Sequence, residues 1–362
     1  MKPGKKNVTG ASWINSAKSV GALLVALALG ALLLTVAGYS PIRAYGAIIK
    51  GAVGSKSALI NTLVQMVPLL FTGLSFAFAS RAGLISLGME GQMLAGAMAA
   101  AVVGAWELPV PAPVHVILAM TAGMLAGGLW GFLTGFLKVK FGANEFIVTI
   151  MLNYIAQFLT SYLTNGPLRD ETSMISQTRL VSPSALLPKL MKGRGLTIAL
   201  FLGILCAAGV WFFMEKTRPG YETRAVGYSP VGAETAGIAI GAVTMRTMFI
   251  SGAIAAMAGV SMVLGPNERF IDGFSPGYGF NGIAVASLAG TNPLGIIPSA
   301  FIFGGLRAGS LVLNMTQRIQ PEFSDMIQAL VIIFVAMPML FSVRHKAVKK
   351  GGGSQICMEK SM

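Results

Sequence analysis

Charged residues are scarce in this sequence, and their scarcity excludes most kinds of soluble protein. Asp, Glu, Lys and Arg together make up 11% of the 362 residues, whereas hydrophobic residues make up 54%. Soluble globular domains carry about a quarter charged residues. The mean hydropathy of +0.71 agrees, and the composition therefore predicts an integral membrane protein.

Cysteine and histidine are also rare, which argues against metal chemistry. The two cysteines, Cys206 and Cys357, form no CxxC pair, and the only histidines are His115 and His345. The sequence has no glycine-rich phosphate loop ending in Gly-Lys-Ser/Thr, no HExxH motif and no Ser-His-Asp set. We therefore expect no metal site, no cofactor, no nucleotide site and no enzymatic activity.

The net charge of +14 would suggest nucleic-acid binding in a soluble protein. Here the basic residues lie between apolar runs, where they set membrane topology and contact anionic lipid headgroups. We expect membrane lipid as a partner and no nucleic acid. The distribution of Lys and Arg predicts that both termini are cytoplasmic, with a cytoplasmic segment at 1–18 and a cytoplasmic tail at 344–362.

The apolar runs are long and lack the two-residue alternation of barrel strands, so they predict helices. We expect an all-α, polytopic transmembrane bundle over residues 19–343, with about ten membrane segments at roughly 20 residues each. They are placed near 19–38, 58–80, 84–106, 114–137, 143–164, 195–214, 246–265, 278–290, 294–313 and 325–343.

Two stretches predict broken or re-entrant helices. Arg81–Gln92 holds three glycines and a glutamate between two apolar runs, and Gly273–Pro298 is dense in Gly and Pro. Such breaks are tolerated only where protein or a wet cavity covers the freed backbone groups. Breaks of this kind occur at corresponding positions in the two halves of transporters. The two stretches therefore suggest a pseudo-repeat, although they share no clear sequence identity.

Polar residues recur at every fourth position in the fifth apolar run and predict a polar helix face. This stripe comprises Glu145, Thr149, Asn153, Gln157 and Ser161. This stripe is either the wall of a hydrated translocation path or an interhelical hydrogen-bond seam. Glu90, in a glycine-flanked turn, is either a structural cap or a gating residue. Arg307 is a further charge within an apolar run, for which we expect snorkelling to the outer face. The residues that we assign to the path are Glu90, Gln92, Glu145, Thr149, Asn153, Gln157 and Asn281.

Two features concern packing and docking. Gly123, Gly127, Gly131 and Gly135 form a small-xxx-small face that predicts close helix packing. The larger loops are an outer loop at 165–194 and an inner loop at 215–246. The inner loop is long enough for one or two short helices. It is either a docking site for a soluble partner or a simple connection.

Four blocks of sequence resemble a known family in register and in order. They are GLISLGMEGQMLAGA at 83–97, NEFIVTIMLNYIA at 144–156, GYETRAVGYSPVGAETAGI at 220–238 and GYGFNGIAVASLAGTNPLGI at 277–296. Together they resemble the permeases that work with basic membrane lipoproteins in nucleoside ABC importers. The wider family includes permeases for ribose and branched-chain amino acids. Ser229 departs from the asparagine expected there, and the EAA pattern of other importers is absent.

The resemblance implies a permease subunit of a bacterial plasma membrane importer for nucleosides. Ribose or another simple sugar is the alternative solute, and an ion-coupled secondary transporter with Glu90 or Glu145 as its proton site is the alternative mechanism. The resemblance also implies three partners: a cytoplasmic ABC ATPase, a second permease subunit in a heterodimer, and an extracytoplasmic solute-binding lipoprotein. By resemblance, the residues that contact the ATPase are Tyr221, Glu222, Arg224, Gly227, Pro230 and Glu234.

Overall fold

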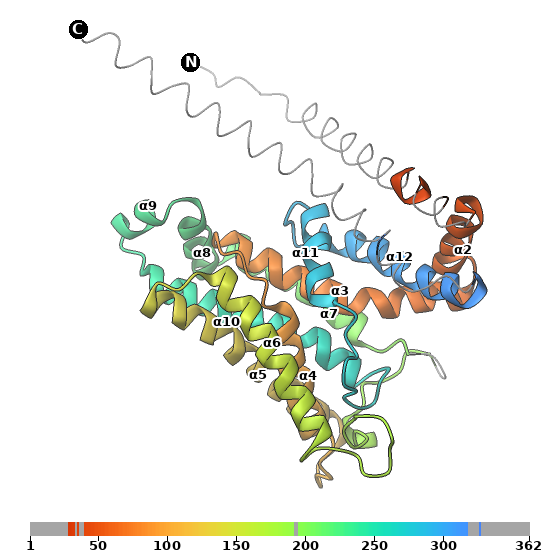
Figure 1. The fold of residues 1–362 in the computed structure, drawn as a ribbon. Coiled ribbons are helices and arrows are strands. Elements are labelled where there is room, and N and C mark those ends of the chain that lie inside the picture. The colour runs from red at the N-terminus through yellow and green to blue at the C-terminus, as the bar shows by residue number, and fades with distance from the viewer. Residues whose placement is uncertain (1–27, 33–34, 36–39, 192–194, 318–325, 327–362) are drawn as a thin grey trace. The chain divides into compact units, whose positions relative to one another are not determined.

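The computed structural model describes residues 28–32, 35, 40–191, 195–317 and 326, and in this part of the chain the all-α prediction is confirmed. The only strand-like pairings among these residues are three isolated β-bridges. The helices (Figure 1) are α2 Pro41–Val53, α3 Lys56–Arg81, α4 Met89–Gly104, α5 Ala112–Phe141, α6 Glu145–Asn165, the 3-10 helix η1 Pro183–Ala185, α7 Ala199–Lys216, α8 Arg218–Tyr228, α9 Pro230–Thr235, α10 Ile240–Val263, α11 Tyr278–Leu288 and α12 Ile296–Gln317.

Six of the described helices are long and apolar enough to cross a membrane, namely α3, α5, α6, α7, α10 and α12. The runs expected at 84–106 and 278–290 form α4 and α11, which have 16 and 11 residues. At about 1.5 Å per residue, neither reaches across a hydrocarbon core of about 30 Å. The run at 325–343, most of the run at 19–38, and both ends that we predict to be cytoplasmic lie outside the described residues. The count of about ten segments and the location of the termini therefore stay predictions.

The chain divides into two compact units, and every site discussed below lies in one of them. This unit comprises Ile49–Gly309, and the other combines Met1–Ile48 with Ser310–Met362. Within Ile49–Gly309, α3 is the most enclosed of the spanning helices, with 78% of its most apolar stretch buried. Its apolar residues point in all directions, as expected of a helix surrounded by other helices.

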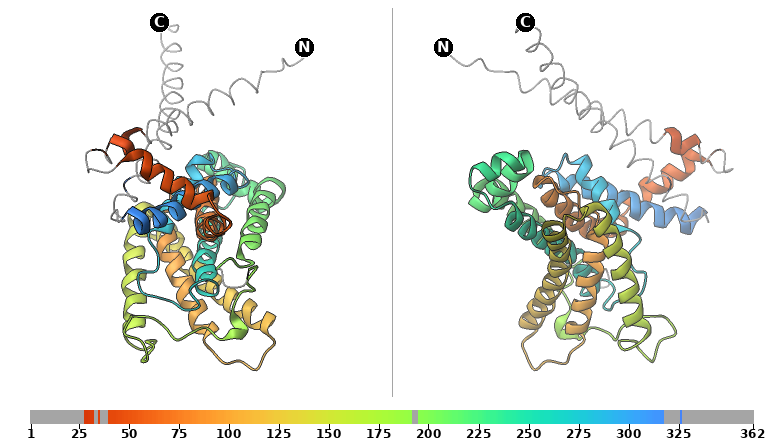
Figure 2. Two further views of the ribbon diagram at one scale, coloured as in Figure 1. Left: turned by 90° about the vertical axis from the view of Figure 1, so that its right-hand side faces the viewer. Right: turned by 60° about the vertical axis from the view of Figure 1, so that its left-hand side comes forward.

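Close packing of α5 against α4 and α10 confirms the prediction from the glycine repeat. A Cβ added at Gly127 would lie 2.4 Å from Ala256 Cβ, and one at Gly131 would lie 2.3 Å from the Met248 carbonyl oxygen. The helix backbones can approach this closely only because the glycines carry no side chain. As a result, α5 and α10 lie side by side (Figures 1 and 2).

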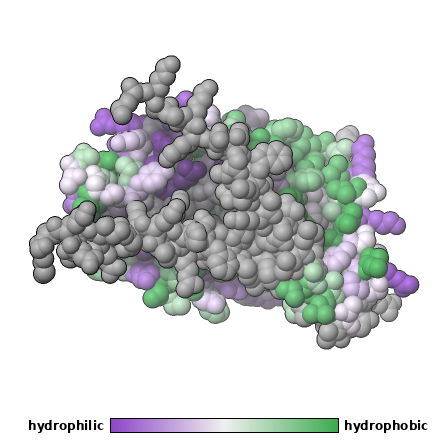
Figure 3. All heavy atoms as spheres, turned by 90° about the horizontal axis from the view of Figure 1, so that it is seen from above, coloured by the Kyte–Doolittle hydropathy of each residue, from purple (hydrophilic) through white to green (hydrophobic). Residues whose placement is uncertain are grey.

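Large apolar side chains are exposed on several spanning helices. Phe158 on α6 is 71% exposed, and Leu205 on α7 is 68% exposed. Green hydrophobic side chains cover broad parts of the described surface in Figure 3. Soluble monomers rarely expose contiguous apolar patches of this extent. The surface is therefore one that lipid or another membrane subunit would cover.

Candidate functional site

The break predicted at Arg81–Gln92 is present between α3 and α4. The helix α3 ends at Arg81, and residues 82–88, which we call the connector, are non-helical. Gly83 has a φ of 74°, a left-handed conformation that glycine adopts without strain. The second predicted break surrounds α11, where Gly277 precedes the helix with a φ of 82° and Gly290 follows it with a φ of 58°. In each irregular stretch a short helix begins directly after a glycine, α4 after Gly88 and α11 after Gly277.

The first turns of these two short helices meet at Glu90. Glu90 lies in the first turn of α4, and its Oε2 accepts a hydrogen bond of 2.7 Å from the backbone N–H of Gly279 in the first turn of α11. The first N–H groups of a helix have no partner within that helix, and they attract negative charge. Glu90 therefore caps α11 across the interface, which is a capping role on a helix other than its own. A gating role stays a prediction.

Further polar groups gather at the start of α11. The Tyr278 hydroxyl donates a hydrogen bond of 2.5 Å to Gln65 Oε1 on α3, and Asn281 lies in the same first turn of α11. The Arg307 guanidinium lies 5.7 Å from the centre of the Tyr278 ring, in a cation–π contact. Sequence reasoning assigned Glu90 and Asn281 to one path but missed Gln65 and Arg307 as members of the group, because they come from distant helices.

Two residues of the α6 stripe hold the connector in place. Asn153 Oδ1 accepts a hydrogen bond of 2.8 Å from the Gly91 N–H, and Asn153 Nδ2 donates one of 2.8 Å to the Leu87 carbonyl. Thr149 Oγ1 accepts a hydrogen bond of 3.3 Å from the Leu87 N–H. Both side chains are buried. At these positions the stripe makes hydrogen bonds between helices, as the alternative interpretation expects.

The rest of the stripe has different surroundings. Glu145 forms an ion pair of 2.6 Å with Lys138 on α5. Gln157 is exposed, and Ser161 donates a hydrogen bond of 2.8 Å to Asp272 Oδ2. The structure therefore does not bring the stripe together as one surface, although Thr149 and Asn153 lie next to the turn that carries Glu90.

Gln92 lies between the connector and α5, because a Cβ added at Gly88 would be as close to its amide nitrogen as one added at Gly131. Its side chain is 1% exposed, and neither its amide nitrogen nor its amide oxygen has a hydrogen-bond partner among the described residues. A Cβ added at Gly131 on α5 would lie 3.2 Å from the Gln92 nitrogen. Buried amides usually have partners, because an unsatisfied group costs about 1–3 kcal/mol.

The inner loop contains two short helices, as predicted. They are α8 and α9, and Ser229 caps α9 by accepting a hydrogen bond of 3.1 Å from the Gly232 N–H. This contact gives a local reason for serine at a position where the resemblance leads us to expect asparagine. The helix α10 begins at Ile240, so the last residues assigned to the loop belong to a spanning helix.

The residues expected to contact an ATPase fall into three groups. Glu222 and Arg224 form ion pairs with Arg246 and Glu215, at 3.2 and 2.9 Å. Gly227 packs against the connector: a Cβ there would lie 2.1 Å from the Arg81 carbonyl oxygen. The others are exposed, and with their neighbours they form the exposed inner face Tyr221, Tyr228, Pro230, Val231 and Glu234.

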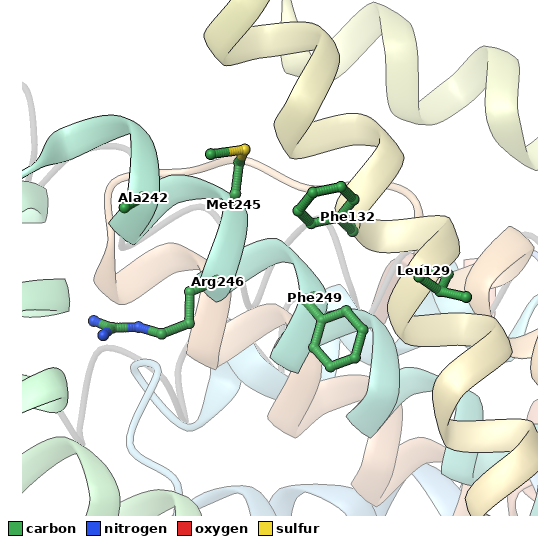
Figure 4. A pocket seen from close by; sticks show the side chains of 6 residues that line it. All are labelled: Leu129, Phe132, Ala242, Met245, Arg246 and Phe249. Carbon is green, nitrogen blue, oxygen red and sulfur yellow. The ribbon is translucent and has the colours of Figure 1, made fainter.

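One sizeable pocket lies elsewhere, in a groove between α5 and α10. Its volume is about 470 Å³, and it is lined by Leu129, Phe132, Ala242, Met245, Arg246 and Phe249. Figure 4 shows that the Arg246 guanidinium points away from Phe132 and Phe249. The groove is almost wholly apolar and shares no residue with the Glu90 group, so it is not part of the candidate path.

Known proteins are similar to this chain over most of its length. The family described as branched-chain amino acid transport system / permease component matches residues 58–336. The guanosine ABC transporter permease protein NupP of Bacillus subtilis is 37% identical, over 91% of this chain and 96% of NupP. The glucose ABC transporter permease protein TsgB13 of Haloferax volcanii is 32% identical, over 91% of this chain and 89% of TsgB13.

A third relative also carries a nucleoside name. The nucleoside ABC transporter permease protein NupB of Lactococcus lactis is 32% identical, over 91% of this chain and 93% of NupB. The family match spans both broken stretches and the inner loop. The chain belongs to the branched-chain amino acid transport system / permease component family.

Proposed function

We propose that this chain is the membrane-spanning subunit of an ATP-driven importer and forms the translocation path for nucleosides. The observation that carries the proposal is the 37% identity to a guanosine permease over almost the whole of both chains. A second nucleoside permease at 32% identity supports it. A glucose permease is 32% identical as well, so a simple sugar is the competing solute.

The proposed partners are an ATPase, a second permease and a solute-binding lipoprotein. Two different guanosine permease proteins of Bacillus subtilis, NupP and NupQ, are 37% and 25% identical to this chain. Their similarity supports a heterodimer of permeases in a bacterial plasma membrane. The exposed inner face Tyr221, Tyr228, Pro230, Val231 and Glu234 is the proposed ATPase contact, because it displays aromatic and apolar side chains beside a charge.

The proposed path runs past the start of α11. Glu90 and Asn281 would face it, together with Tyr278, Gln65 and Arg307, which are donors and acceptors suited to a polar, uncharged solute. Thr149 and Asn153 would hold its wall, since they fix the connector and the turn that carries Glu90. Glu145, Gln157 and Gln92 remain in the proposed path as residues of the same two helices.

Gentle purification of the chain from its native membrane, followed by mass spectrometry, tests the proposed assembly. We expect an ABC ATPase and a second permease in stoichiometric amounts. A chain that purifies alone and accumulates solute under an ion gradient without ATP would contradict the proposal and support the secondary-transporter alternative.

A further inference from the structure

The short helix α11 is separated from its neighbours at both ends. Gly277 precedes it and Gly290 and Thr291 follow it, all with φ between 57° and 82°. Thr291 is not glycine, so its left-handed backbone carries some strain. The Thr291 N–H closes the end of the helix by donating to the Ala286 carbonyl at 2.9 Å. This 11-residue helix can therefore be fixed or displaced independently of the chain segments on either side of it.

A charged side chain lies near each end of α11, and each has the sign that the helix dipole favours. At the N-terminus, Glu90 accepts the hydrogen bond from Gly279, and the Ser275 side chain also bonds Glu90. Beyond the C-terminal end, Arg81 Nη2 donates a hydrogen bond of 3.3 Å to the carbonyl of Thr291, the third residue after Leu288. A carboxylate at the start and a guanidinium at the end both stabilise a helix.

These two charges come from the two sides of one segment. Arg81 is the last residue of α3 and Glu90 is in the first turn of α4, so they flank the connector, residues 82–88. Neither forms an ion pair with a described residue. Glu90 therefore contacts the first turn of α11, and Arg81 contacts the segment that directly follows this helix.

The connector also contacts α8, the first helix of the inner loop. Gly227 on α8 approaches so closely that a Cβ there would lie 2.1 Å from the Arg81 carbonyl oxygen, and a Cβ at Gly83 would lie 3.4 Å from the Gly227 Cα. Backbone packed against backbone leaves no flexible side chain to absorb a shift. A displacement of α8 must therefore displace the connector.

We propose that Arg81 and Glu90 are positioning residues that join the connector and α11 into one body, through which α8 moves the start of α11. This inference rests on the proposed function, because it assigns a direction of coupling from the inner loop to the path. The moving end of α11 carries Tyr278, which contacts Gln65 and Arg307. Movement of α8 would thus make or break the contacts of Tyr278 with Gln65 and Arg307.

Reconstituted complexes test the coupling with conservative variants. In Arg81→Gln and Glu90→Gln we expect assembly to be retained and ATP hydrolysis to stay within about twofold of wild type, while uptake per ATP falls about tenfold or more. The double variant should show little further loss of uptake per ATP than either single variant, because both residues hold the same body. Arg81→Lys keeps the charge and a donor, and should recover part of the loss.

Exposed residues provide matched controls in Arg43→Gln and Glu107→Gln, which should behave as wild type. If uptake per ATP is unchanged in both Arg81→Gln and Glu90→Gln, the proposal is overturned.

A distance measurement tests, without a transport assay, whether α8 and α11 move together. Spin labels would replace Arg218, whose side chain on α8 is 92% exposed, and Leu294, which follows α11 and is 42% exposed. Cys206 and Cys357 would first be changed to serine. We expect the same label distance in the nucleotide-free and ATP-trapped complex, and a distance that changes between them once Arg81→Gln and Glu90→Gln are added. A distance that already changes without those substitutions would overturn the inference. A wild-type complex that takes up no nucleoside would instead count against the proposed function.

Discussion

At the scale of single residues, Asn153 bonds one buried and one partly buried backbone group. Its amide pairs with the Gly91 N–H and the Leu87 carbonyl, both at 2.8 Å. Each group left unpaired costs about 1–3 kcal/mol. The residue therefore stabilises the connector whether or not solute passes it.

Replacing Asn153 with leucine should lower the free energy of unfolding by about 1–3 kcal/mol for each group that loses its partner. Gln157→Leu, on the same helix at an exposed position, should have little effect. Thermal unfolding in detergent would measure both. Equal melting temperatures for the two variants would show that the Asn153 hydrogen bonds contribute nothing to the fold. Transport assays on the same two variants would then show which of them serves the path.

The buried amide of Gln92 leads to the opposite expectation. Since no described group bonds either of its atoms, Gln92→Leu removes an unsatisfied amide and keeps a similar volume. Stability should stay equal or rise by up to about 3 kcal/mol. A lower melting temperature would contradict the absence of a partner. A rise in stability with a loss of uptake would indicate that Gln92 serves transport at a cost to the fold.

At the scale of elements, the contact between α8 and the connector depends on Gly227. Alanine at this position would place Cβ 2.1 Å from the Arg81 carbonyl oxygen, so the two segments would have to separate. We expect Gly227→Ala to reduce uptake per ATP about tenfold or more, by analogy with other coupling losses. Gly209→Ala on α7 is the control, because a Cβ there meets nothing within 4 Å. Similar uptake in both variants would show that close approach at Gly227 is not needed.

Local sequence patterns predicted the elements well where a single segment determines the structure. The run at 58–80 became α3, Lys56–Arg81, and the dense glycines of the two irregular stretches mark the breaks beside α4 and α11. The inner loop formed two helices, as its length allowed. The 13-residue helix α2 was missed, because it is too short to resemble a membrane span.

Contacts between distant segments could not be predicted in the same way. The carboxylate of Glu90 and the N–H of Gly279 meet only because two short helices begin at the same place. The sequence indicates a charge in a glycine-rich turn, but not which helix end it caps. Likewise, the spacing of Thr149 and Asn153 predicts a shared face, whereas the connector that they bond lies on another part of the chain.

At the scale of the whole molecule, the family match and the broken helices agree on a transport subunit. The short helices α4 and α11 pack against the spanning helices α3, α5, α6 and α10, and Glu90 and Tyr278 lie in their first turns. A rigid frame with a small movable part suits alternating access, in which only a few contacts must change.

Uptake of labelled guanosine by vesicles that contain the purified complex is the most direct test of the central claim. We expect accumulation that requires binding protein and internal ATP, that persists when a protonophore collapses the ion gradient, and that excess unlabelled nucleoside abolishes but excess glucose does not. Uptake that needs no ATP and stops with the protonophore would contradict the claim. ATP-driven uptake of glucose without guanosine uptake would retain the ATP-driven importer and overturn the nucleoside assignment.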